Sequence, residues 1–318
     1  MKYVGILRQQ SSNNFKSILL LIMFPVLLLG LLWLFCIIVF PDSTDYYDTS
    51  GFYYLTPVEA FKNYAPIVVI VTIIWFLIAY SLHSWMISSA TNSKPLERIE
   101  NKRVYNLVEN LCMTQGLSMP KINVIEDSSL NAFASGINKK NYTVTLTRGI
   151  INRLNDDELE GVIAHELSHI RNRDVRLLIV SIIFVGIFTF IAQFAIRALW
   201  YAPRRSSGGK NDKGGGLILL VVAALAAIGY LISLLLRFAI SRKREYVADA
   251  MAAEMTKNPH ALAMALRKIS NDPKIESITR EDVAQLFIEH PLNKKGGLST
   301  LFATHPPIHT RIEILEQF

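Results

Sequence analysis

The sequence predicts a mainly α-helical integral membrane protein in which a second pair of apolar helices interrupts an α+β domain. Hydrophobic residues make up 51% of the 318 residues, and they are too clustered for an ordinary soluble enzyme. Each of four apolar stretches is about long enough to cross a hydrocarbon core of ~30 Å. These stretches cover residues 18–40, 65–82, 177–201 and 217–236.

The first two stretches predict an N-terminal membrane anchor, residues 1–90, with transmembrane helices at about 18–40 and 65–82. The first stretch is too long for the core of a cleaved signal peptide, which has 7–15 residues. Basic residues precede it and follow the second stretch, whereas the charged residues between the two stretches, within residues 41–64, are mostly acidic. Since positive charge stays in the cytoplasm, we expect the N-terminus and the region after residue 82 to be cytoplasmic.

The second pair of stretches predicts an apolar hairpin, residues 177–240, that divides the α+β domain into residues 91–176 and 241–318. If both helices cross the membrane, the basic loop between them is exported against the positive-inside rule. A hairpin that lies partly in protein or at the interface is therefore an open alternative. Outside the hairpin, we expect helices at residues 91–115, 255–270 and 281–289.

A metal-binding motif, His165-Glu166-x-x-His169, lies on a helix predicted for residues 155–174. Asn155 is a plausible N-cap, and the two histidines, four residues apart, project from one face of the helix. That spacing suits two imidazole nitrogens on one zinc ion, and Glu166 can take a proton from a water whose pKa the ion lowers. With only Cys36 and Cys112 in the chain, a cysteine zinc knuckle is excluded.

A third ligand is expected on the segment SRKREYVADA, which offers Glu245 and Asp249 one helical turn apart. We favour Glu245 as the ligand and Asp249 as the acceptor that orients a ligating histidine. The alternative is a solvated helix face on which Glu245 pairs with a nearby arginine. Small and apolar residues around both acids favour a buried helix, where a carboxylate needs a partner.

This set of residues resembles the membrane-bound gluzincin peptidases typified by HtpX and the CaaX prenyl endopeptidases. Two further segments share the resemblance: NAFASG at residues 131–136 and THPPIHTRI at residues 304–312. Two apolar stretches before the motif and two between its halves match the HtpX layout, so the resemblance covers nearly the whole chain. It implies a zincin-like catalytic domain with a small β-sheet and one Zn²⁺ per chain.

The resemblance also implies roles for further residues. His305 and Arg311 would stabilise the oxyanion; the alternatives are a histidine in a proline-rich turn and an arginine on an exposed helix. An edge strand would bind the substrate backbone, and three segments rich in β-formers, residues 121–127, 131–137 and 142–150, agree with a sheet. The substrate-binding residues would be Asn131, Ala132, Phe133 and Ala134.

The leading hypothesis is a membrane-embedded zinc endopeptidase with a cytoplasmic active site, and a bacterial inner membrane is the location that fits best. Its role in quality control, the cleavage of misfolded or damaged membrane proteins, follows from the resemblance alone. Alternatives are a narrow processing peptidase for lipidated or prenylated substrates and a non-catalytic, zinc-stabilised membrane scaffold. We expect protein substrates and the lipid bilayer as partners, with a homo-oligomer as an open option. Nucleic acid is not expected, because the net charge of +7 comes from basic residues that flank apolar stretches.

Overall fold

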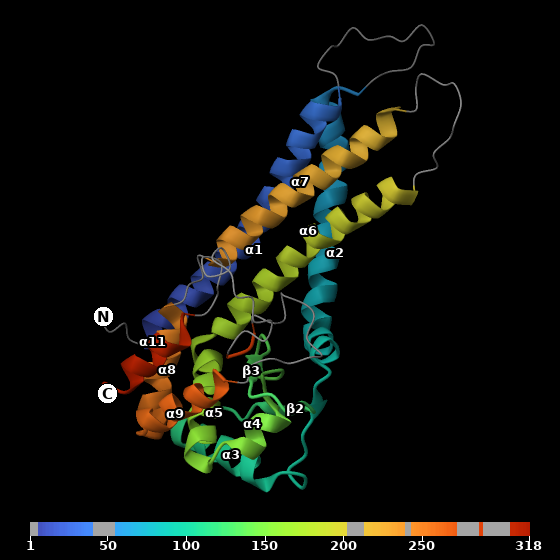
Figure 1. Cartoon of the computed structure of the whole chain (residues 1–318). Helices are drawn as coiled ribbons and strands as arrows, with labels where there is room; N and C mark the ends of the chain where they lie inside the picture. The colour runs from blue at the N-terminus through green and yellow to red at the C-terminus, as the bar shows by residue number, and fades with distance from the viewer. Residues whose placement is uncertain (1–5, 41–54, 202–212, 239–242, 272–285, 289–305) are drawn as a thin grey trace, which may run out of the picture. The chain divides into compact units, whose positions relative to one another are not determined.

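The computed structural model describes residues 6–40, 55–201, 213–238, 243–271, 286–288 and 306–318 (Figure 1). The chain divides into two compact units, each of which is considered by itself. The helical unit consists of Ile18–Ser81 and Val180–Arg237. The mixed unit consists of Met1–Ser17, Leu82–Ile179 and Phe238–Phe318. The predicted fold class, a mainly α-helical membrane protein with a small sheet, is confirmed.

The helical unit consists of residues from four long helices, and many of their large apolar side chains are exposed. Within the described residues, three helices are long and apolar enough to span a membrane: Asn14–Val39, Pro57–Thr91 and Asp174–Ala198. The fourth predicted stretch is helical, but its apolar part with described side chains, Ile218–Ile232, is shorter than a span. The full helices are α1 Ile6–Val39, α2 Pro57–Thr91, α6 Asp174–Tyr201 and α7 Lys213–Phe238.

Close packing inside the helical unit depends on one glycine. The ring of Phe188 on α6 lies edge-on to Phe24 on α1, with the ring centroids 5.3 Å apart. A Cβ atom added at Gly229 on α7 would collide with the Phe188 ring, so a larger residue would force the two helices apart. Aromatic and small residues therefore set the helix contacts here.

The mixed unit contains a four-stranded sheet in the order β1-β2-β4-β3. The two central strands are parallel, and β1 and β3 are antiparallel to their neighbours. All three predicted β-rich segments are confirmed as strands, and β3 is an edge strand, as expected. The strands are β1 Lys94–Pro95, β2 Lys121–Ile125, β3 Ala132–Ser135 and β4 Thr143–Thr147.

Helix α5, Asp156–Asn172, packs against β3 and against two later helices, α8 and α9 (Figure 1). It begins with a capping box: the Asn155 side chain accepts from the Glu158 backbone N–H at 2.9 Å, and the Glu158 carboxylate accepts from the Asn155 N–H at 3.0 Å. It ends where Arg173 adopts a left-handed conformation with φ of 60°. The helix predicted for residues 155–174 is thereby confirmed.

The other helices of the mixed unit close the core around α5. Buried apolar side chains from the sheet and α5 form this core, including Phe133, Leu146, Ile150, Leu159, Ile163 and Leu167. The surrounding helices are α3 Lys102–Gln115, α4 Arg148–Arg153, α8 Lys243–Thr256, α9 Pro259–Ile269 and α11 Ile308–Leu315.

Three predicted helices need correction. The helix expected at residues 91–115 begins only at Lys102, because Pro95 lacks an N–H and restricts the residue before it, which favours the strand β1. The helix expected at residues 255–270 divides at a turn, where Pro259 starts α9. Of the helix expected at residues 281–289, the described residues 286–288 form a turn and bend.

Candidate metal centre

Three ligand-type side chains converge inside the mixed unit: His165 and His169 from α5, and Glu245 from α8. The Nε2 atoms of the two histidines are 3.1 Å apart. The carboxylate oxygens of Glu245 lie 3.6 Å from the Nε2 atom of His165 and 3.7 Å from that of His169. Tetrahedral coordination at 2.0–2.2 Å would place such donors roughly 3.3–3.6 Å apart. These donors therefore fit a single metal ion.

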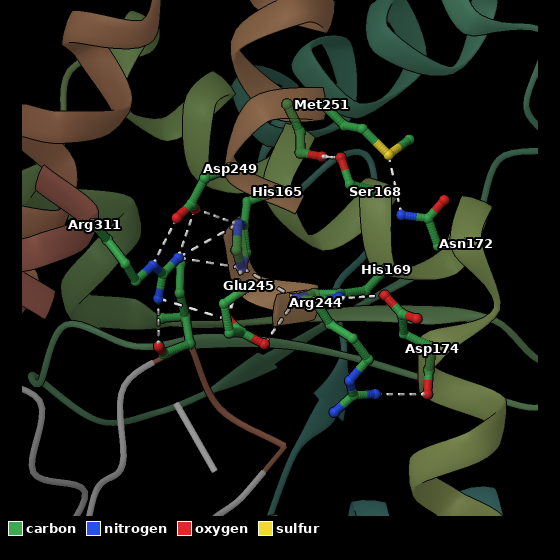
Figure 2. A network of polar contacts seen from close by, with 12 residues as sticks. His165, Ser168, His169, Asn172, Asp174, Arg244, Glu245, Asp249, Met251 and Arg311 are labelled. Carbon is green, nitrogen blue, oxygen red and sulfur yellow. Dashed lines mark hydrogen bonds and ion pairs between the residues drawn. The ribbon is translucent and has the colours of Figure 1, made fainter. Parts of the chain in front are cut away.

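Each histidine is held from behind by a carboxylate (Figure 2). The Nδ1 atom of His165 lies 2.9 Å from Asp249, the residue predicted to orient a ligating histidine. The Nδ1 atom of His169 lies 3.2 Å from Asp174, the first residue of α6. A carboxylate on Nδ1 fixes the ring so that Nε2 faces the other ligands. Sequence reasoning missed Asp174, because it treated this residue only as the end of the helix predicted for residues 155–174.

Glu166 lies next to the ligands and is 1% exposed. It accepts a hydrogen bond from the backbone of Ala134 on β3, so it stands between the ligand cluster and the edge strand. Burial raises the pKa of Glu166 above its usual value, and the neighbouring histidines oppose that shift. The geometry provides a carboxyl group beside the metal centre that is not itself one of the three converging ligands.

Arg311 reaches the centre from α11 and is fully buried, which excludes the alternative of an arginine on an exposed helix. Its guanidinium makes two hydrogen bonds to the Asp249 carboxylate, at 2.8 and 2.7 Å (Figure 2). Burial alone would raise the pKa of Asp249, but the Arg311 charge and the hydrogen bonds from Arg311 and His165 together outweigh burial and lower that pKa. The contact of Arg311 with an oxyanion stays a prediction. His305 lies outside the described residues.

The electrostatics of the centre favour a cation. Four buried carboxyl groups, those of Glu166, Asp174, Glu245 and Asp249, surround the two histidines, and Arg311 supplies one buried positive charge. Burial by itself would lower the pKa of His165, but hydrogen bonds to Asp249 and Glu245 raise it to about 9. The carboxylates that stabilise a proton on this fully buried imidazole can also stabilise the positive charge of a divalent ion.

The predicted substrate-binding residues, Asn131 to Ala134, lie on or next to β3 and are all buried. The Ala132 carbonyl accepts a hydrogen bond from the Ile288 N–H at 2.8 Å. The rings of Phe133 and Phe287 are also in contact, with their centroids 4.6 Å apart. The sequence gives no local signal for this contact, which joins residues far apart in the chain.

Comparison with known proteins identifies the family of the chain. The model of Peptidase family M48 matches residues 98–318. A protease HtpX homolog of Bacteroides fragilis is 60% identical over 326 aligned residues that cover all of both chains. A protease HtpX homolog of Listeria innocua is 41% identical over 251 residues, which cover 76% of this chain and 83% of the relative. The crystal structure of S. mikatae Ste24p aligns with a TM-score of 0.45 and 21% identity, covering 80% of this chain and 58% of that one. The chain therefore belongs to peptidase family M48 and is a membrane protease.

Proposed function

We propose that the chain is a zinc endopeptidase of the bacterial inner membrane, which cleaves misfolded or damaged membrane proteins from the cytoplasmic side. The observation that carries this proposal is the convergence of His165, His169 and Glu245 with Glu166 directly beside them. Two imidazole nitrogens and one carboxylate oxygen are the donor set of many catalytic zinc sites, which keep a fourth position open.

The residues of the chain have separate tasks in this reaction. The bound ion would supply Lewis acidity toward the scissile carbonyl and lower the pKa of a water molecule. Glu166 accepts the proton of the attacking water and delivers it to the leaving nitrogen, so that the amide bond breaks without a free amide anion. Asp249 and Asp174 contact the Nδ1 atoms of His165 and His169 and fix the orientation of the two rings.

Arg311 is well placed to hold a carbonyl oxygen. Its Nη1 atom lies 3.3 Å from the backbone carbonyl oxygen of Ile288 while the rest of the guanidinium remains on Asp249. This contact supports the proposal that Arg311 stabilises negative charge on the substrate oxygen, with His305 as its partner by resemblance to the family.

The membrane location of the substrates is supported by the chain itself. Asp174, which contacts the ligand His169, is also the first residue of a candidate span. The basic residues at the N-terminus and after residue 82 favour a cytoplasmic position for the domain that holds the site. A protease fixed there would meet cytoplasmic loops and unfolded segments of membrane proteins.

The test is zinc-activated proteolysis. The full chain is purified in detergent with a chelator, and cleavage of an unfolded test protein is measured before and after zinc is added. We expect zinc to activate the wild type, while Glu166→Gln binds zinc but does not cleave. Equal cleavage by both forms would remove Glu166 from the mechanism, and zinc binding without cleavage by either would favour the scaffold alternative.

A further inference from the structure

The outer edge of β3 is the surface on which a substrate backbone would lie, and the register of the sheet identifies its atoms. Thr147 donates its backbone N–H to the Asn131 carbonyl at 3.0 Å, and Phe133 stands opposite Thr145 in the antiparallel pair. In such a pair, alternate residues direct their backbone groups to the partner strand. The backbone groups of Ala132 and Ala134 therefore point away from β4, toward the outer edge.

A segment of the same chain, Leu286–Ile288, is attached to that edge. Its Ile288 N–H donates to the Ala132 carbonyl at 2.8 Å, the type of main-chain bond that a peptide makes to an edge strand, although the segment itself forms a turn and bend. The side chain of Phe287 packs on the ring of Phe133. All three residues of the segment are buried, with exposures of 7%, 0% and 2%.

The opposite side of the segment faces the catalytic residues. The Ile288 carbonyl oxygen is 3.3 Å from Arg311, whose guanidinium is in turn 3.6 Å from Glu245 and 3.5 Å from a ring nitrogen of His165. The backbone of Ile288 is thus held between the edge strand and the arginine that adjoins two metal ligands. Under the proposed function, a substrate peptide would make the same two contacts.

We propose that Leu286–Ile288 is an internal occupant of the substrate groove, which a substrate must displace. The proposal rests on the proposed function and names its substrate class. Main-chain hydrogen bonds are the same for every sequence, so selection falls to the side chains that the groove buries. Those side chains are leucine, phenylalanine and isoleucine, and the groove accordingly takes segments rich in large apolar residues, as an unfolded membrane protein exposes.

The occupant lowers the apparent affinity for substrate by the fraction of molecules in which the groove is open. Phe287→Ala removes the ring contact and weakens the occupant, while it leaves the catalytic side chains in place. We expect this variant to lower KM for an apolar peptide by roughly 3–10-fold with little change in kcat. Leu266→Ala, a truncation of a fully buried residue on α9, is the matched control for a general loss of core packing.

A binding measurement tests the same point without catalysis. A fluorescent peptide that copies residues 283–290 is titrated into full-length, zinc-loaded Glu166→Gln and into the double variant with Phe287→Ala. We expect the double variant to bind the peptide roughly 3–10-fold more tightly, and a copy of the peptide with alanine in place of phenylalanine to bind more weakly to both.

The outcomes are separable. Equal or weaker peptide binding by the double variant, with a thermal stability loss like that of Leu266→Ala, would show that the segment is fixed core and overturn the inference. If wild type shows no Glu166-dependent cleavage, the proposed function fails. The peptide titration still decides whether the groove is internally occupied.

Discussion

In the mixed unit the side chains of His165, Glu166 and Arg311 are no more than 1% exposed, whereas in the helical unit Ile22, Val26 and Ile70 are 60%, 63% and 57% exposed. The two units thus place polar and apolar groups in opposite ways. Buried polar groups are stable only with specific partners, and helices covered with exposed apolar side chains are stable in a solvent such as lipid. A bilayer would stabilise the exposed apolar side chains of the helical unit. The ion pairs, together with a bound metal ion, would stabilise the buried polar groups of the mixed unit.

This difference predicts where the chain is sensitive. In the mixed unit, loss of one partner leaves a buried charge without compensation. Substitutions that keep the size of the side chain but remove its charge should therefore still lower the stability of the fold. In the helical unit, van der Waals contacts with lipid do not depend on orientation as hydrogen bonds do. Replacing one apolar residue by another should therefore be tolerated, whereas introducing a charged residue should not.

The largest effect is expected from Arg311→Met, which leaves the Asp249 carboxylate buried without its guanidinium. Loss of one partner of a buried pair costs about 3–5 kcal/mol of folding free energy. The control is Arg98→Met, which breaks an exposed pair with Glu109 and should cost at most about 1 kcal/mol. Thermal unfolding in detergent measures both, and similar shifts would contradict the contrast between buried and exposed pairs.

A charge in the helical unit should come next. Ile70→Lys places a lysine within the candidate span Pro57–Thr91, where insertion costs about 2.5–3.5 kcal/mol. Met113→Lys, at a position 68% exposed in the mixed unit, should be nearly neutral. The fraction of protein recovered in membranes reports the difference. Equal recovery of the two variants would mean that Ile70 does not face lipid.

A smaller effect is expected at Asp174, which holds the ring of His169. Asp174→Ala should weaken zinc binding by about 10–100-fold, as loss of a carboxylate behind a ligating histidine commonly does. Competition with a chromophoric chelator measures this affinity, and Asp174→Asn should recover part of it because its amide oxygen can still accept the Nδ1 hydrogen bond. Asp156→Asn, in the exposed first turn of α5, is the control and should bind zinc like the wild type.

The smallest effect concerns the cap of α5. Asn155→Ala removes the side-chain acceptor of the Glu158 N–H and should cost about 1 kcal/mol of stability. Asn155→Asp keeps a side-chain acceptor and should lower the stability by about a few tenths of a kcal/mol at most. Unfolding temperatures compare the two variants, and an alanine variant as stable as the wild type would deny the cap its role.

Local signals explain which parts of this architecture the sequence could predict. The N-cap Asn155, the spacing of the two histidines and the β-rich segments each act within a few residues, and the structure contains the elements that they indicate. Glu245 could be predicted as a ligand because a carboxylate on an apolar helix needs a partner.

Long-range contacts explain what the sequence could not predict. The pairing of Arg311 with Asp249 and of Ile288 with Ala132 joins segments far apart in the chain, and neither end carries a local signal for the other. Asp174 begins α6 and contacts His169, and neither role was predicted from the sequence, because this residue was placed at the end of the helix predicted for residues 155–174.

Zinc binding by the full chain, measured by equilibrium dialysis in detergent, tests the central claim most directly. The account predicts one zinc ion per wild-type chain and a large loss of affinity in Glu245→Gln, whose amide replaces the carboxylate that lies 3.6–3.7 Å from both Nε2 atoms. Unchanged binding by Glu245→Gln, or no stoichiometric binding by the wild type, would contradict the claim that these three residues form the metal centre.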